Sequence, residues 1–121
     1  MKYDLIVIGA GSGGVRAARI ASVHGAKVAI VENNRFGGTC VNVGCVPKKL
    51  YYYLSQLNKD IDNYKSYGWS IPKPSLNWKL FMKKKDQEIS RLNKIYEGIL
   101  NRNKIDIING CLLYTSDAAD D

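Results

Sequence analysis

Apolar and polar residues follow two different periods along this chain, and the change of period predicts the order of its elements. Continuous apolar runs, typical of strands buried in a parallel sheet, lie at residues 3–8, 27–31 and 105–108. Apolar residues three and four positions apart predict helices at 15–24, from 46 to about 63, and from 77 to about 101. This order predicts an α/β fold, a Rossmann-like parallel sheet with a βαβ dinucleotide-binding unit and a long helical crossover.

Turn and capping residues set the predicted limits of these elements. Gly25 is placed to end the first helix, and Asn77 is a good N-cap for the last one. Residues 68–75, which include two prolines, predict a loop. The return of the chain to the same sheet at residue 105 predicts a right-handed crossover.

Composition narrows the class of protein. The chain has 121 residues, of which 45% are hydrophobic, enough for one modest globular domain. The net charge is +7, but the run Lys83–Lys85 is not interleaved with aromatic residues, so it favours a solvated helix face over a nucleic-acid site. No stretch is long enough to span a membrane. Three cysteines without a secretory signal favour a cytoplasmic protein.

The first candidate site is a glycine-rich turn between the first strand and the first helix. Gly9, Gly11 and Gly14 fit the pattern G-x-G-x-x-G, and Glu32 ends the second strand about twenty residues later. The glycines allow a pyrophosphate to approach the positive end of the helix. Glu32 can accept hydrogen bonds from ribose hydroxyls and would repel a 2′-phosphate, which predicts FAD or NAD as the nucleotide.

The second candidate site is a pair of cysteines, Cys40 and Cys45, in another glycine-rich segment. A disulfide between them would close only a very short loop and would remove little entropy from the unfolded chain. This favours a reversible redox pair over a structural disulfide. Pro47 favours a helix that begins near Cys45, where the helix dipole and nearby lysines would stabilise a thiolate. The alternative is a zinc site, but zinc needs three or four ligands and only Cys111 and His24 remain, both distant in sequence. We expect no metal.

Together the two sites indicate a dithiol beside a bound dinucleotide, and a flavin is the nucleotide that accepts two electrons. The glycine turn, Glu32 and the motif from Gly37 to Lys49 resemble the flavin-dependent pyridine nucleotide–disulfide oxidoreductases, most closely the glutathione reductases. The resemblance covers residue 2 to about residue 110. It implies that residues 1–111 are a partial, N-terminal FAD-binding domain. Residues 112–121 fit no expected strand and are interpreted as a non-native or disordered tail.

The resemblance also assigns roles to matching residues. Cys40 is similar to the interchange thiol that attacks the disulfide substrate, and Cys45 to the thiol that lies against the flavin. Lys48 matches the lysine near the reactive flavin nitrogen; the adjacent Lys49 could share this role or be a solvated helix residue. The residues expected to bind the cofactor are Gly9, Gly11, Ser12, Gly13, Gly14, Glu32, Thr39, Cys40 and Lys48.

The substrate implied by the resemblance is glutathione disulfide, whose carboxylates would favour a basic site. Arg19 resembles an arginine that pairs with such a carboxylate, and Ser12 and Tyr96 match further substrate contacts. Arginines at positions 16 and 19 would repel the cationic substrate of the trypanothione-specific relatives. The alternatives are that Arg16 is an exposed helix residue and that Tyr96 only packs between helices.

The expected activity is therefore NADPH-dependent reduction of glutathione disulfide by a homodimeric cytoplasmic enzyme. The NADPH domain and a histidine–glutamate acid–base pair of the family are absent from the sequence, so the 121-residue chain alone is expected to be inactive. Two alternatives stay open. One is a dihydrolipoamide dehydrogenase-type enzyme of the same family, and the other is a non-catalytic FAD- or NAD-binding module.

Overall fold

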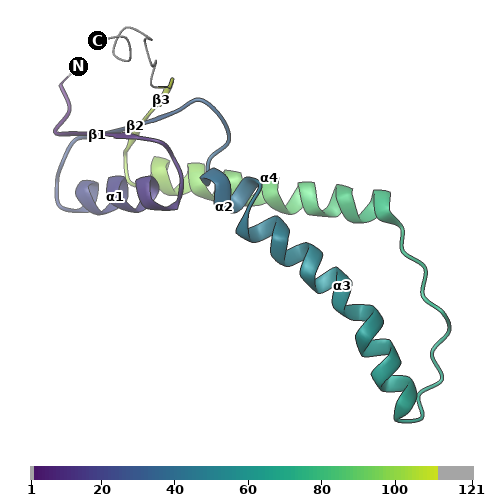
Figure 1. Cartoon of the computed structure of the whole chain (residues 1–121). Helices are drawn as coiled ribbons and strands as arrows, with labels where there is room; N and C mark the ends of the chain where they lie inside the picture. The colour runs from purple at the N-terminus through teal and green to yellow at the C-terminus, as the bar shows by residue number, and fades with distance from the viewer. Residues whose placement is uncertain (1, 112–121) are drawn as a thin grey trace, which may run out of the picture.

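The computed structural model describes residues 2–111, so the predicted tail at 112–121 lies outside the described residues. The elements, in chain order, are β1 (Leu5–Ile8), α1 (Ser12–Val23), β2 (Val28–Glu32), α2 (Gly38–Asn42), α3 (Cys45–Ser66), α4 (Trp78–Arg102) and β3 (Asp106–Asn109). Figure 1 shows a small sheet at one end of the molecule and two long helices that extend from it. The predicted α/β class with a parallel sheet is confirmed.

The three strands form a parallel sheet in which β2 lies between β1 and β3. Leu5 of β1 pairs with Val28, and Ala29 pairs with Asp106 of β3. Because the strands are parallel, their carboxyl ends meet at one edge, where Gly9 donates its N–H to the carbonyl of Val31 at 2.7 Å. The glycine turn after β1 and the end of β2 therefore share the edge where parallel sheets bind ligands.

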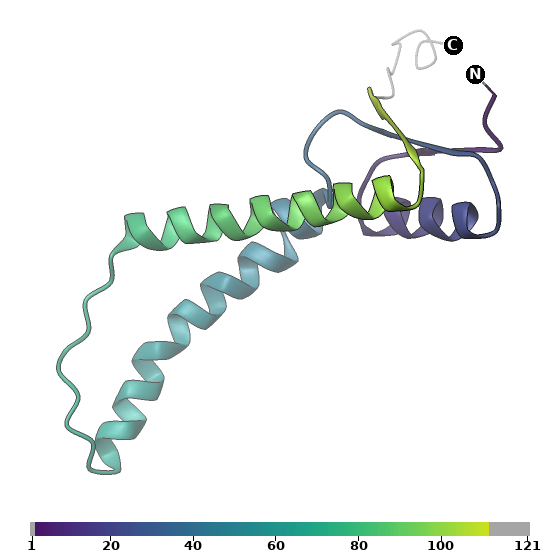
Figure 2. The ribbon, with the colours of Figure 1, turned by 180° about the vertical axis from the view of Figure 1, so that it is seen from behind.

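One face of the sheet carries the core. Helices α1 and α4 lie side by side under this face (Figures 1 and 2), and Ser22 of α1 donates a hydrogen bond of 2.6 Å to the carbonyl of Asn103 just after α4. The buried side chains of the core cluster are Ala10, Val15, Ala18, Val28, Ile30, Leu100 and Ile105. This packing fixes α1, and with it the glycine turn, against the strands.

The other face of the sheet differs from the prediction. The apolar run at residues 3–8 predicts a strand buried on both faces, yet Ile6 and Ile8 of β1 are each 54% exposed. Val7, between them, packs against the core, so the alternation of side chains along a strand puts Ile6 and Ile8 on the opposite face. Among residues 2–111, no helix covers that face (Figures 1 and 2). A strand is buried on both sides only where two layers enclose the sheet.

The predicted caps are present. Gly25 follows α1 in the left-handed conformation, with φ of 91°, and the N–H of Ala26 donates to the carbonyl of Ala21 at 3.1 Å, which closes the helix end. The side chain of Asn77 accepts the N–H of Leu80 at 3.0 Å at the start of α4. Helix α1 begins three residues earlier than predicted, at Ser12, so the end of the glycine motif forms its first turn.

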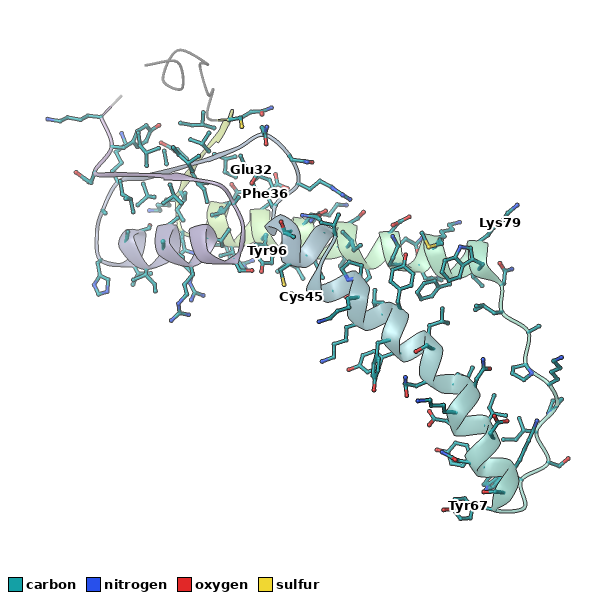
Figure 3. All side chains as sticks on the ribbon, viewed as in Figure 1. Glu32, Phe36, Cys45, Tyr67, Lys79 and Tyr96 are labelled. Atoms are coloured by element: carbon teal, nitrogen blue, oxygen red, sulfur yellow. The ribbon has the colours of Figure 1, made fainter. Side chains whose placement is uncertain are left out.

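Helices α3 and α4, with the segment 67–77 between them, form an antiparallel arm that extends away from the sheet (Figures 1 and 2). Aromatic rings hold the two helices together: the ring of Tyr51 lies 6.0 Å from that of Trp78 and 5.4 Å from that of Phe81. Leu57 belongs to the apolar period of α3, yet it is 52% exposed because the helices diverge toward the outer end, where Figure 3 places Tyr67. Within residues 2–111, no helix is long and apolar enough to cross a membrane.

Candidate active site

The glycine turn has the geometry of an anion-binding loop. Gly9 has φ of 97°, a conformation that side chains rarely adopt. A Cβ atom on Gly14 would lie 2.0 Å from the carbonyl oxygen of Gly9, whereas one on Gly13 would meet no atom within 4 Å. Helix α1 is capped by Gly11, without a side-chain hydrogen bond or an acidic residue in its first turn. Open space beside free helix N–H groups fits the pyrophosphate of a dinucleotide.

Glu32 joins this turn to the loop after β2. Its carboxylate accepts the N–H of Ala10 at 2.8 Å, and those of Asn33 and Asn34 at 3.0 Å each. Two carboxylate oxygens offer about four acceptor sites, so one remains for a ligand such as a ribose hydroxyl. Glu32 also lines a hollow of about 280 Å³ together with Thr39, another predicted cofactor contact.

The two predicted redox cysteines come together at the junction of α2 and α3. Cys40 lies on the short helix α2, and Cys45 is the first residue of α3, beside the end of the arm nearest the sheet (Figure 3). Pro47 is in the first turn as the third helical residue, not at the first position that its preference suggested. Both cysteines are free thiols in the structure, so the disulfide between them stays a prediction.

The thiols are electrostatically linked. A hydrogen bond to the side chain of Cys45 is the largest of the effects that raise the pKa of Cys40 above its ordinary value. The backbone N–H of Cys45 and the positive charge of Lys48 oppose this rise. The positive charge of Lys48 therefore acts on Cys40, while its role beside the flavin stays a prediction. Lys49 instead places its ammonium 5.7 Å from the centre of the Tyr53 ring.

The predicted substrate residues lie along the line where α1 meets α4. The hydroxyl oxygens of Ser12 and Tyr96 are 3.5 Å apart, so the structure brings together two residues that are 84 positions apart in sequence. Tyr96 also packs against the core, as its alternative interpretation holds. Arg19 lies farther along α1 and lines a different hollow of about 470 Å³ with Arg102 and other residues. Arg16 is exposed on α1.

Comparison with known proteins identifies the family. A model of the family described as "Pyridine nucleotide-disulphide oxidoreductase" matches residues 3–120. The chain belongs to this family. Its glycine turn, Glu32 and the two cysteines all lie within the residues that the family model matches.

Three similar proteins within this family are named glutathione reductase. The chain is 51% identical over 108 residues to a glutathione reductase of Burkholderia cepacia and 46% identical over 108 residues to one of Nostoc sp., each match covering 89% of the chain. It is 47% identical over 116 residues, 90% of the chain, to a glutathione reductase of Debaryomyces hansenii. In each case the match covers only 24% of the relative's length.

Sequence reasoning missed the helix α2 and two asparagines that hold it. Asn42, on α2, and Asn93, on α4, are joined by a hydrogen bond of 2.9 Å. A signal for Asn93 exists in the sequence: it lies between Ile89 and Tyr96 at helical spacing, a polar residue within an apolar stripe.

Among residues 2–111, no group of three or more metal-binding side chains comes together.

Proposed function

We propose that residues 1–111 are the FAD-binding, dithiol-bearing part of a reductase that passes electrons from NADPH to glutathione disulfide. The observation that carries the proposal is the close packing of α2, which bears Cys40, against the start of α3, which bears Cys45, in a chain of this family: a Cβ atom on Gly44 would lie 3.4 Å from the Cα of Cys40. The names of the three relatives support glutathione disulfide as the substrate. A cytoplasmic location, predicted from the cysteine content, belongs to the same proposal.

The residues of this chain suit an FAD. Gly13 leaves room at the start of α1 for the pyrophosphate, and Glu32 keeps an acceptor for the ribose. The negative charge of Glu32 would disfavour a 2′-phosphate at this position. When bound, the flavin would supply a two-electron exchange with the dithiol. The remaining proposed contacts come from Gly9, Gly11, Ser12, Gly14, Thr39, Cys40 and Lys48.

The dithiol chemistry can be written for these residues. The Cys40 sulfur, once deprotonated, attacks one sulfur of glutathione disulfide, forms a mixed disulfide and releases one glutathione. Cys45 then attacks the Cys40 sulfur, forms the Cys40–Cys45 disulfide and releases the second glutathione. Two electrons leave the two cysteines, and their two protons end on the two glutathione thiols. The Cys45 side chain, whose interaction with Cys40 raises the pKa of Cys40, would receive the Cys40 proton.

The substrate would lie near the seam between α1 and α4. Ser12 and Tyr96 offer paired hydroxyls, and Arg19 offers a positive charge for a carboxylate. We propose a homodimer for the whole enzyme. The exposed tyrosines of the arm, Tyr52 at 57% and Tyr53 at 58%, support a role of this surface in subunit contact.

Thiol counting tests the redox pair in the 121-residue chain. After air oxidation, one free thiol should react, that of Cys111, and mild reduction should restore all three. Peptide mapping of the oxidised chain should find the Cys40–Cys45 link. Three free thiols after oxidation would refute the dithiol.

Substitutions in the whole enzyme test the roles of the cysteines and the substrate. Cys40→Ser should allow flavin reduction by NADPH but stop turnover, whereas Cys45→Ser should separate the remaining thiol from the flavin. Arg19→Ala should mainly raise KM for glutathione disulfide, because a contact made equally in ground and transition states is uniform binding. Arg16→Ala, on the same helix, is the control. Faster turnover of lipoamide or trypanothione disulfide would refute the substrate and leave the dithiol chemistry standing.

A further inference from the structure

The helix that carries Cys40 is too short to hold its own position. Helix α2 has five residues, and isolated helices shorter than about 12–15 residues are marginal in water. Its N-cap is Gly37, which has φ of 96° and provides no side-chain hydrogen bond. The position of Cys40 therefore depends on what α2 contacts.

The glycine turn holds the first end of α2. Gly37 donates its N–H to the carbonyl of Ala10 at 2.8 Å. Gly38 packs so closely that a Cβ atom there would lie 2.8 Å from the Cα of Gly11. These contacts fix the start of α2 but leave its second half, with Cys40, to be fixed by other residues.

Two asparagine side chains hold the second half of α2. The side-chain nitrogen of Asn42 lies 2.9 Å from the carbonyl oxygen of Gly38 and 3.2 Å from that of Phe36. The side-chain nitrogen of Asn93, from the middle of α4, donates to the same Phe36 carbonyl at 2.6 Å and to the Asn42 oxygen at 2.9 Å. Both asparagines are partly buried, and they are 51 positions apart in sequence. One amide on α4 thus binds both the loop before α2 and the last residue of α2.

We propose that Asn93 and Asn42 are positioning residues that hold Cys40 at the distance at which its sulfur can bond to Cys45. Cys40 precedes Asn42 by two residues on the same short helix. The start of α3 packs tightly on α2, since a Cβ atom on Gly44 would lie 2.9 Å from the carbonyl oxygen of Thr39. A disulfide needs a narrow range of Cβ separations, about 3.5–4.5 Å. A small displacement of α2 therefore changes how easily the two sulfurs join.

Asparagine suits this position because of its donors. Asn93 uses its amide to donate to two oxygen acceptors at once. Aspartate has the same shape but no donor when ionised, so it would set a carboxylate against the Phe36 carbonyl. Alanine removes the group without adding a charge. If hydrogen bonding matters, aspartate should be at least as harmful as alanine; if only volume matters, alanine should be the worse.

The inference rests on the proposed function, because it concerns the Cys40–Cys45 couple. The reaction to measure is the exchange in which the dithiol and one glutathione disulfide give the protein disulfide and two glutathiones. The full 121-residue chain is equilibrated with glutathione and glutathione disulfide at fixed pH, quenched with acid and alkylated. The Cys40–Cys45 disulfide is then quantified by mass spectrometry, and helicity is followed by circular dichroism.

We expect Asn93→Asp and Asn42→Asp each to lower the equilibrium constant for disulfide formation about tenfold, the loss expected for one or two hydrogen bonds. Asn93→Ala should lower it by a similar or smaller factor. The double variant Asn42→Asp/Asn93→Asp should lower it by less than the product of the single effects, because the two side chains share a bond. Asn101→Ala, an exposed asparagine on the same helix, is the matched control and should leave the constant unchanged.

The outcomes distinguish a failure of the positioning role from a failure of the proposed function. Folded variants whose constants equal that of the parent chain would overturn the positioning role and leave the proposed function intact. A larger effect for Asn93→Ala than for Asn93→Asp would assign the residue to packing and would overturn the role as well. If Asn93→Asp loses helicity, Asn93→Ala is compared with the parent chain alone, and an unchanged constant in Asn93→Ala would overturn the positioning role. A parent chain that forms no Cys40–Cys45 disulfide would refute the proposed function together with the positioning role.

Discussion

At the scale of single residues, the chemistry of the site depends on one sulfur next to another. Cys40 and Cys45 lie on different helices, and what brings them together is the close packing of α2 against the start of α3. The hydrogen bond between their side chains raises the pKa of Cys40, and the charge of Lys48 partly offsets that effect. The reactivity of Cys40 is therefore a property of the pair.

The pH dependence of Cys40 alkylation tests this link. A raised pKa means that a smaller fraction of Cys40 is thiolate at a given pH, so its reaction with iodoacetamide should begin at higher pH than that of an ordinary cysteine. Cys45→Ala removes the largest cause and should move the profile to lower pH. Lys48→Gln removes an opposing charge and should move it to higher pH. Alkylation of the reduced chain, resolved by peptide mass, gives the profiles. Profiles that do not move would show that Cys40 titrates independently.

Gly14 and Gly13 are neighbours, but we expect the fold to require a glycine at position 14 and the ligand to require one at position 13. Alanine at Gly14 would place its Cβ 2.0 Å from the carbonyl oxygen of Gly9 and should cost about 1–3 kcal/mol of stability or more. Alanine at Gly13 meets no atom within 4 Å and should not lower the free energy of unfolding. It should instead weaken FAD retention in the whole enzyme if the pyrophosphate occupies that space. Urea unfolding and flavin content are the two measurements. Unchanged flavin content in Gly13→Ala would place the pyrophosphate elsewhere.

At the scale of elements, the ends of the helices account for much of what local sequence determines. Gly25 and Gly68 follow α1 and α3 in the left-handed conformation, as expected for glycine after a helix. After α4 the same position is taken by Lys104, with φ of 53°. There the N–H of Ile105 donates to the carbonyl of Leu100 at 3.1 Å, as the N–H of Ala26 does to the carbonyl of Ala21 after α1. The same capping motif therefore closes α4, but with a lysine in the unfavourable left-handed conformation.

Lys104→Gly should therefore stabilise the chain. The left-handed conformation costs a non-glycine residue roughly 1–2 kcal/mol, part of which is lost again because glycine makes the unfolded chain more flexible. We expect a gain of about 0.5–1 kcal/mol in the free energy of unfolding, measured with urea. The matched control is Lys94→Gly, exposed in the middle of α4, which should lose about 1 kcal/mol. A loss in both variants would contradict the strain assigned to Lys104.

The parts of the fold that sequence could predict are those determined by local patterns. The three strands, the long helices and the cap at Asn77 follow from apolar period and capping chemistry, and the glycine turn and Glu32 follow from their spacing. Helix α2 could not be predicted, because five residues beginning with glycine carry no helical period and are held by contacts with distant segments. The exposure of Ile8 on β1 could not be predicted either, since an apolar run does not specify how many layers cover a sheet.

At the scale of the whole molecule, the described residues have one packed core and two exposed surfaces, namely the uncovered face of the sheet and the arm. Helices α1 and α4 bury one face of the sheet, while the face with Ile6 and Ile8 is open and the arm projects beyond the core (Figures 1 and 2). Neighbouring exposed apolar side chains are typical of an interface. The chain spans 24% of the length of the three glutathione reductases. We propose that further protein covers both surfaces in the whole enzyme.

Flavin retention should reflect this incomplete enclosure. The hollow beside Glu32 has a volume of about 280 Å³, just below the range of roughly 300–1,000 Å³ for small-molecule sites. The whole enzyme should purify yellow with bound FAD, whereas the 121-residue chain should bind FAD weakly, because the glycine turn and Glu32 would contact only part of the nucleotide. Equilibrium dialysis with FAD compares the two proteins, and Glu32→Ala in each is the control for binding at this edge of the sheet. Tight stoichiometric binding by the chain, lost in Glu32→Ala, would show that residues 1–111 already form the complete site.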